Sequence, residues 1–192
     1  SGTFTSQEPL DAGEYLMQVA IEDINYMGQA EFSYVITKSA PTIRFNPVVS
    51  PITYTDDGQE AVFEGGEVIF NGQVKTGSYR LVESVAHLQV GTHNVSYCFT
   101  PDDSRNLKEV YGVVAVSIIK KDLSEYIVFE GEHTVQYNAQ SHRVRASMIT
   151  GENVAIEIYY NRSKAPPRER GEYTVSAEII DKNYSGSKEW EK

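Results

Sequence analysis

A sixteen-residue motif occurs twice in this chain, and this repetition constrains the fold more than any other feature of the sequence. Residues 13–28 read GEYLMQVAIEDINYMG and residues 171–186 read GEYTVSAEIIDKNYSG, and the two agree without a gap at eight positions. Self-similarity at a fixed offset is the sequence signature of structural modules joined in tandem. We therefore expect more than one copy of a single module.

Apolar residues alternate with polar ones through both copies of the motif. Alternation with a period of two marks a strand with one face on a core and the other in water. Turn signals such as Asp56-Asp57-Gly58, Gly65-Gly66 and Asn71-Gly72 separate such runs. The sequence therefore predicts an all-β chain of tandem immunoglobulin-like antiparallel β-sandwich modules. The inward set is Tyr15, Met17, Val19 and Ile21 in the first copy and Tyr173, Val175, Ala177 and Ile179 in the second.

A second, fainter repeat places the boundaries between modules. Ile36-Thr37-Lys38 matches Ile118-Ile119-Lys120 at an offset of 82, and each triplet closes a strand. Between them, Gly91-Thr92-His93 followed by Asp103 and Asn106 resembles a divergent copy of the motif. We therefore predict modules at residues 1–38, 39–121 and 122–192. The first is expected to hold only the C-terminal half of a module, and the last to be truncated in its final strand.

Each part of the motif has a predicted structural role. The glycine at its start allows a backbone conformation that other residues resist, and the tyrosine two positions later is expected to point inward with its hydroxyl free to bond a loop. Asp and Asn side chains close turns, and the tyrosine after them is expected to pack at the corner of the sandwich. The residues concerned are Gly13, Tyr15, Asp23, Asn25 and Tyr26 in the first copy and Gly171, Tyr173, Asp181, Asn183 and Tyr184 in the second.

The motif also resembles a known family. Ala12-Gly13-Glu14-Tyr15, followed by Asp23, Asn25-Tyr26 and Gly28, is similar to the MBG-type repeat of bacterial surface proteins and adhesins. Residues 171–186 carry the same pattern, and residues 136–140 resemble that family's early Tyr-Asp-Gly segment, with Ala139 in place of the usual glycine. The resemblance makes residues 1–38 the C-terminal half of an MBG-like module and residues 122–192 a second one.

The middle stretch is similar to bacterial immunoglobulin-like (Big) repeats. The similarity lies in Val90-Gly91-Thr92-His93 and in residues 99–103, while Leu107 stands where that family usually has Tyr. The two resemblances together imply an extracellular protein, on a bacterial cell surface or secreted. They carry over no catalytic residue, because the families have none at the matching positions.

Charge and composition exclude several classes of partner. The formal net charge is −10, with 27 acidic against 17 basic residues, so the surface repels nucleic-acid phosphates and no basic stripe offsets this. No apolar run approaches the roughly 20 residues that span a bilayer. Cys98 is the only cysteine, so no internal disulfide can form. We expect neither nucleic-acid binding nor membrane insertion of this chain.

Catalysis has little support in the sequence. There is no Gly-x-Ser-x-Gly nucleophile elbow, and no pair of the four histidines has zinc spacing. A dyad of Cys98 with His93 would need two side chains five residues apart, which a strand places on opposite faces. The chain is therefore predicted not to be an enzyme.

Two sets of residues are candidates for binding. Asp56, Asp57, Asp102 and Asp103 are paired carboxylates in turns, and such hard oxygen ligands could hold calcium. Apart from calcium, no cofactor is expected. Tyr159, Tyr160 and Arg162 could stack on sugar rings, although adjacent tyrosines on a strand face opposite sides, so one of the two is expected in the core.

Two functions therefore remain open at this level. The leading one is a non-catalytic structural stalk that presents a distal domain of a surface protein, with neighbouring modules of the same longer chain as its partners. The alternative is an adhesin module that binds a host glycan, mucin or protein through exposed loop aromatics. The two differ in whether a module presents an aromatic or apolar binding patch.

Overall fold

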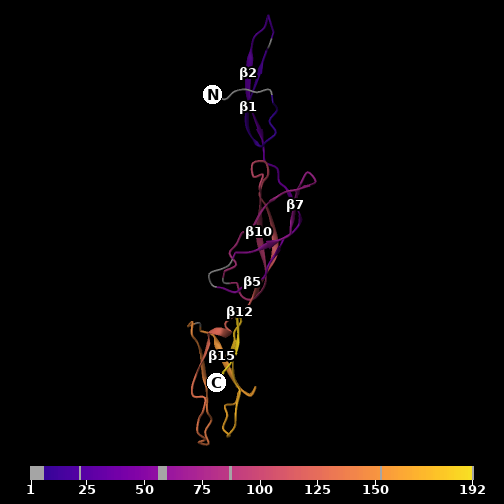
Figure 1. The fold of residues 1–192 in the computed structure, drawn as a ribbon. Coiled ribbons are helices and arrows are strands. Elements are labelled where there is room, and N and C mark those ends of the chain that lie inside the picture. The colour runs from indigo at the N-terminus through magenta and orange to yellow at the C-terminus, as the bar shows by residue number, and fades with distance from the viewer. Residues whose placement is uncertain (1–6, 22, 56–59, 87, 152, 192) are drawn as a thin grey trace. The chain divides into compact units, whose positions relative to one another are not determined.

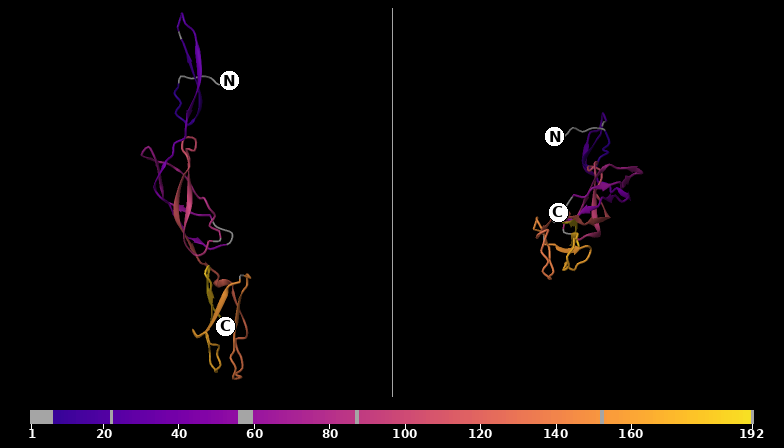
Figure 2. Two further views of the ribbon diagram at one scale, coloured as in Figure 1. Left: turned by 180° about the vertical axis from the view of Figure 1, so that it is seen from behind. Right: turned by 60° about the horizontal axis from the view of Figure 1, so that its bottom comes forward.

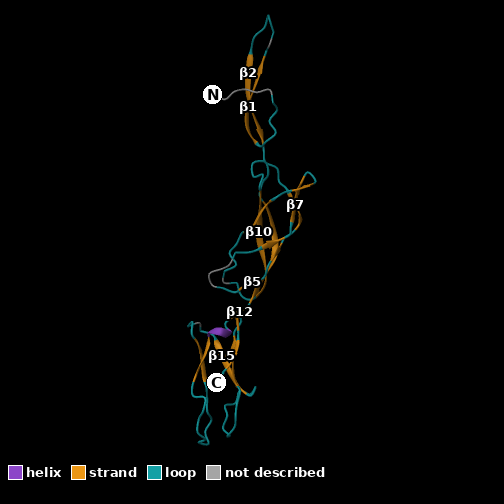
Figure 3. Cartoon of the chain, in the orientation of Figure 1, coloured by secondary structure: helices purple, strands orange, loops and turns teal. Residues whose placement is uncertain are grey.

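The computed structural model in Figures 1 and 2 describes residues 7–21, 23–55, 60–86, 88–151 and 153–191. Within these ranges the chain is built from β-strands, and its one helical element is a single 3-10 turn, η1 (Ser124–Tyr126; Figure 3). In the same ranges no helix has the length and apolar character needed to cross a membrane. The predicted all-β fold with several antiparallel sheets is confirmed.

The chain divides into two compact units, which are described separately. Unit 1 comprises Ser1–Val49, Val62–Glu83 and Asn94–Val114, and unit 2 comprises Ser50–Ala61, Ser84–His93 and Ala115–Lys192. The strands that lie in unit 1, wholly or in greater part, are β1 (Gly13–Ala20), β2 (Gln29–Ile36), β3 (Thr42–Phe45), β4 (Val48–Val49), β6 (Phe63–Glu64), β7 (Glu67–Phe70), β8 (Gln73–Val74), β9 (Gly77–Leu81) and β10 (Gly91–Pro101).

The first part of unit 1 is a hairpin of two eight-residue strands. β1 and β2 pair antiparallel from Gly13 opposite Ile36 to Ala20 opposite Gln29 (Figure 1). Residues directly opposite each other project from the same face of a hairpin. One face therefore carries an apolar set and the other a mainly polar one. The apolar set is Tyr15, Met17 and Val19 from β1 with Ala30, Phe32 and Tyr34 from β2.

The remaining strands of unit 1 form small sheets joined by tight turns. The sheets are β3-β7-β8, β4-β6 and the run β9-β10-β11, of which β11 (Val110–Ile119) begins in this unit. Between β7 and β8, Asn71 and Gly72 have φ angles of 50° and 73°, as the favoured two-residue hairpin turn requires. The predicted turn at Asn71-Gly72 is confirmed. The predicted turn at residues 56–58 lies outside the described residues.

An aromatic cluster fills the core of unit 1. Tyr97 and Phe99 project from β10 and are 0% and 2% exposed. The Tyr79 ring centroid lies 4.9 Å from that of Phe99 and 5.6 Å from that of Phe63. Such packing leaves no room for a side chain at Gly112, where an added Cβ would lie 2.6 Å from the Tyr97 ring.

Unit 2 contains the rest of β11 and all the strands that follow it. β5 (Ile52–Thr53) runs parallel to the end of β11, and β12 (Lys121–Asp122) runs parallel to β17 (Tyr184–Ser185). The other pairings are antiparallel: β13 (Ile127–Glu130) with β14 (Arg145–Met148), and the sheet β15-β16-β18, made of Ala155–Tyr160, Val175–Ile180 and Ser187–Glu189.

A hydrophobic core of unit 2 lies between the β13-β14 pair and the β15-β16-β18 sheet, the orange to yellow part of Figure 2. Leu123, Ile127 and Ala177 are each 0% exposed there. At one side of this core the Phe129 and Trp190 rings stack with centroids 5.6 Å apart. The second copy of the motif thus contributes its inward-facing strand to a closed, two-layer core.

Candidate functional site: the polar junctions between modules

A side-chain-to-carbonyl hydrogen bond recurs at the start of each copy of the motif. The Tyr15 hydroxyl donates to the Asp11 carbonyl oxygen at 2.8 Å, and the Tyr173 hydroxyl donates to that of Glu169 at 3.1 Å. In the middle stretch, His93 Nε2 lies 2.7 Å from the Gln89 carbonyl oxygen. Each bond spans four residues and brackets the residue that precedes the glycine. We call this contact the staple.

The glycine at the start of each motif copy does not have the role that the sequence predicts. Gly13 and Gly171 are not among the glycines with positive φ, so no unusual backbone conformation requires them. Instead, the ring of the tyrosine two positions later folds back over each one. An added Cβ would lie 3.4 Å from Tyr15 at the first position and 3.4 Å from Tyr173 at the second. Both distances are ordinary van der Waals contacts, so neither the ring nor the backbone conformation requires glycine at these two positions.

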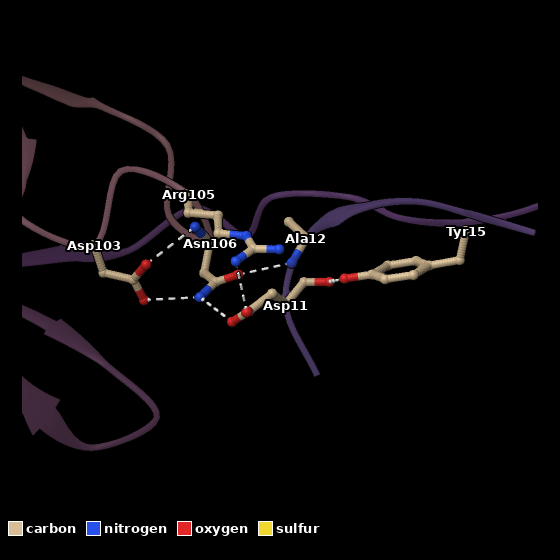
Figure 4. A network of polar contacts seen from close by, with 6 residues as sticks. All are labelled: Asp11, Ala12, Tyr15, Asp103, Arg105 and Asn106. Carbon is tan, nitrogen blue, oxygen red and sulfur yellow. Dashed lines mark hydrogen bonds and ion pairs between the residues drawn. The ribbon is translucent and has the colours of Figure 1, made fainter. Parts of the chain in front are cut away.

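The first staple presents its residues to the side chain of Asn106 (Figure 4). Asn106 Oδ1 accepts the Ala12 N–H at 2.7 Å, and Asn106 Nδ2 donates to the Asp11 carboxylate at 3.0 Å. Arg105 adds an ion pair with Asp11 at 3.0 Å. The Asp103 carboxylate accepts the Asn106 N–H and the Nδ2 group, both at 3.2 Å, and so holds the amide in place. The oriented amide of Asn106 and the guanidinium of Arg105 therefore both join the hairpin to the body of unit 1.

Backbone contacts join the same two parts at a second point. The Ser39 N–H donates to the Asn106 carbonyl oxygen at 2.9 Å, and the Lys108 N–H donates to the Ser39 carbonyl oxygen at 2.8 Å. The Lys38 ammonium donates to the Ser104 carbonyl oxygen. The segment that leaves β2 thus lies against the same turn that receives the staple. We call the two sets of contacts together the first junction.

Unit 2 holds a second junction of the same design around Asn183. Asn183 Oδ1 accepts the N–H of Val90, the residue before the glycine of the middle motif, at 3.2 Å. The Asn183 carbonyl oxygen accepts the Lys121 N–H at 3.0 Å, and the Lys120 ammonium donates to the Asp181 carbonyl oxygen at 2.8 Å. The Asp181 carboxylate accepts the Asn183 N–H at 2.8 Å. The first three contacts repeat those that Ala12, Ser39 and Lys38 make in the first junction, whereas Asp181 lies two residues before its asparagine and Asp103 lies three.

The turn at Asp181 and Asn183 recurs at the tip of the hairpin. The Asn25 N–H donates to the Asp23 carboxylate at 2.7 Å, as in the turn at Asp181. In the part of the chain that the structure describes, the Asn25 side chain has no hydrogen-bond partner. Tyr26 was expected to pack at a corner but is 72% exposed, whereas Tyr184 packs edge-on against Tyr54 with ring centroids 5.4 Å apart. The hairpin therefore presents the same turn without a neighbour.

Comparison with known proteins places the repeated motif in a family. The profile of the MBG domain matches residues 2–40 and 127–189, which is more than half of the chain. The chain belongs to the MBG domain family. No curated protein and no solved structure matches it significantly. The predicted Big-like module at residues 39–121 stays a prediction, because the match leaves residues 41–126 uncovered.

MBG domains are non-enzymatic repeat modules of the kind found in surface proteins. In this MBG chain, Cys98 is fully buried and His93 is engaged in the staple. The two residues weighed as a dyad therefore both serve packing and hydrogen bonding. Among the described residues, no group of three or more His, Cys, Asp or Glu side chains is placed to hold a metal ion.

The candidate calcium ligands fall into two groups. Asp56 and Asp57 lie outside the described residues. Asp102 is exposed, with its N–H bonded to the Thr76 carbonyl oxygen, and Asp103 directs both carboxylate oxygens at Asn106. In this MBG chain Asp103 therefore has a structural role at the junction, and calcium binding at these residues stays a prediction.

Of the candidate sugar-binding residues, Tyr159 and Tyr160 lie on the same strand, β15, but in different surroundings. Tyr160 is 5% exposed, and its hydroxyl accepts the Val144 N–H at 2.8 Å, so its ring belongs to the core. Tyr159 donates to Glu157 at 2.7 Å, and the Lys164 ammonium lies 5.6 Å above its ring centroid. The hydrogen bonds from Lys164 and Tyr159 lower the pKa of Glu157. Arg162 is exposed and has a φ of 67° in the adjoining turn.

Sequence reasoning identified the turns but not most of their partners. Asp11, Arg105 and Ser39 were not singled out, because their contacts span tens of residues and depend on the fold. One sequence signal pointed to the partners of these turns. Lys38 and Lys120 are repeated in the sequence, and they occupy the same place in both junctions.

Proposed function

We propose that this chain is a non-catalytic structural spacer of a bacterial surface protein, which holds a distal domain away from the cell. The observation that supports it is the pair of junctions at Asn106 and Asn183, which share an asparagine side chain that accepts a backbone N–H, a lysine at the same place and the same backbone donors. Modules that only need to be tethered do not require hydrogen-bonded junctions of this kind at each connection.

Two points of attachment make each junction resist bending. At the first junction the covalent link passes through Lys38 and Ser39, while the staple reaches Asn106 from the other strand of the hairpin. A single covalent link acts as a hinge, but a second contact beside it must break before the hinge can swing. Linkers without such contacts leave domain motion as the default.

The alternative function, adhesion through loop aromatics, has weaker support. The ring of Tyr159 is half-buried and covered on one side by Lys164, and Tyr160 lies in the core. A sugar would therefore have to displace Lys164 from both the ring and the Glu157 carboxylate, which it contacts at 2.6 Å. Screening the chain on a glycan array tests this function directly, and saturable binding that Tyr159→Ala abolishes would favour adhesion over the spacer.

Distance measurements across the first junction test the spacer itself. Spin labels at Ser33→Cys and Ser78→Cys, in a Cys98→Ala background, report the separation of hairpin and sheet, since both serines are exposed. A matched pair at Ser78→Cys and Val113→Cys lies within the sheet β9-β10-β11. We expect both pairs to give single distributions of similar width. A far broader distribution for the junction pair would show a hinge and contradict a rigid spacer.

A further inference from the structure

The apolar face of the β1-β2 hairpin is uncovered. Met17 and Val19 on β1 are 39% and 55% exposed, and Phe32 and Tyr34 on β2 are 48% and 46% exposed. Among the described strands, β1 and β2 pair only with each other and form a two-stranded sheet of their own. Clustered aromatic and aliphatic side chains on one sheet face mark a surface that another element covers.

The last module shows what covers the equivalent face. Val19 pairs with Ala30 in the hairpin, and Ala177 pairs with Lys188 in the sheet β15-β16-β18, so the offset of 158 holds in both strands. In the last module this face is closed, because Ala177 is 0% exposed. Phe32 corresponds in the same register to Trp190, whose ring stacks on Phe129 of β13.

The tip of the hairpin is uncovered as well. Ile24 and Met27 are 97% and 93% exposed beside Asn25. At the equivalent turn of the last module, the segment Lys120–Asp122 runs parallel to β17 and donates to the Asp181 and Asn183 carbonyl oxygens. That segment leads directly into Leu123, η1 and β13. One continuous stretch, residues 120–148, therefore covers both the tip and the face of its own partner sheet.

We propose that the hairpin Gly13–Ile36 is the acceptor surface for a β half-module built like residues 120–148. Such a segment carries a lysine that reaches the carbonyl oxygen of Asp23 and an extended strand that bonds Asn25. It continues into an antiparallel strand pair with an aromatic side chain aimed at Phe32. The opposite face of the hairpin is more polar and carries Glu14, Gln18 and Glu31, with Leu16 and Val35 exposed among them.

A synthetic peptide of residues 119–150 with a fluorescent label tests the proposal on the intact chain. Fluorescence anisotropy is expected to show saturable, one-to-one binding. Phe32→Glu in the protein or Phe129→Ala in the peptide should weaken binding about tenfold or more, since each removes the aromatic contact that corresponds to the stack of Phe129 on Trp190. Lys120→Met in the peptide should weaken it by a smaller factor. Ser33→Glu, on the opposite face of β2, is the matched control and should leave binding unchanged.

Several results would overturn the proposal. Absence of binding, or binding that Phe32→Glu leaves unchanged, would show that the face is not an acceptor for such a segment. If Lys120→Met leaves the affinity unchanged, the proposed contact between this lysine and the Asp23 carbonyl oxygen does not form. A dimer of the chain in sedimentation that Phe32→Glu dissociates would show that a second copy covers the face instead. None of these results depends on the junctions at Asn106 and Asn183, so failure of this proposal would leave the proposed spacer function intact.

Discussion

Replacing Asn106 by alanine should open the first junction without disturbing the core beneath it. The substitution removes the bond from the Ala12 N–H, a neutral pair worth about 1 kcal/mol, and the bond to the Asp11 carboxylate, worth about 1.5 kcal/mol at the low end of the charged range. Both are partly exposed, so the sum is about 2–2.5 kcal/mol. Since 1.4 kcal/mol is tenfold, the population of the open junction should rise about 30- to 60-fold.

The N–H of Ser39 is the best reporter of this opening. It donates to the backbone carbonyl oxygen of Asn106, which the substitution leaves in place. Any loss of its protection from hydrogen exchange therefore reports the junction rather than the missing side chain. By NMR-detected exchange, Asn106→Ala should lower protection at Ser39 by about 30- to 60-fold, with the amides of β9 unchanged.

A reciprocal variant controls this experiment. Asn183→Ala should lower protection at Lys121, whose N–H donates to the Asn183 carbonyl oxygen, and should leave Ser39 as it is. If Ser39 exchanges at the same rate with and without the Asn106 side chain, the amide does not hold the junction closed. The reasoning that assigns the clamp to this residue would then be refuted.

Three further predictions concern the cores and pH. Gly112→Ala should lower the free energy of unfolding by about 1–3 kcal/mol in urea titration, because the new methyl group would lie 2.6 Å from the Tyr97 ring. Leu123→Ala should cost about 2–5 kcal/mol by the same measurement, since Leu123 is 0% exposed at the centre of its core. Hydrogen bonds from the neighbouring serine lower the pKa of Asp122 below its ordinary 3.8, so the stability they confer is present above that pH and is lost as pH falls through the folded-state pKa. Thermal melts below pH 4 should therefore show falling stability that Asp122→Asn makes less steep, and an equally steep fall in that variant would contradict the assignment.

The sequence was sufficient to predict the strands and many of the turns. Period-two alternation marked the core-facing residues Val175, Ala177 and Ile179 of the second copy, and Asn71-Gly72 predicted a tight turn that the positive φ angles confirm. In the first copy the same alternation marks one face of the hairpin, but that face is exposed. These signals are local, because strand faces and turn conformations depend on a few adjacent residues. The all-β fold followed from them directly.

The junctions could be predicted only in part. The Asp-x-Asn turns were visible in the sequence, but the partner of each turn lies in a different module. Ala12 and Asn106 are 94 residues apart, and no local pattern encodes that contact. The exposure of Tyr26 was unforeseen for a related reason: its counterpart Tyr184 is half-buried through contacts with residues outside the motif, including Tyr54. A repeat therefore predicts equivalent shapes more reliably than equivalent surroundings.

Small-angle X-ray scattering of the whole chain tests the central claim most directly. A compact globule of 192 residues has a radius of gyration of about 16 Å. Modules held end to end by clamped junctions, each about 30 Å long from the rise of its strands, should give about 25–30 Å. We predict a radius of gyration in the higher range for the unmodified chain. In Asn106→Ala and Asn183→Ala we expect a smaller radius or a broader distribution of interatomic distances. A value near 16 Å would contradict a spacer.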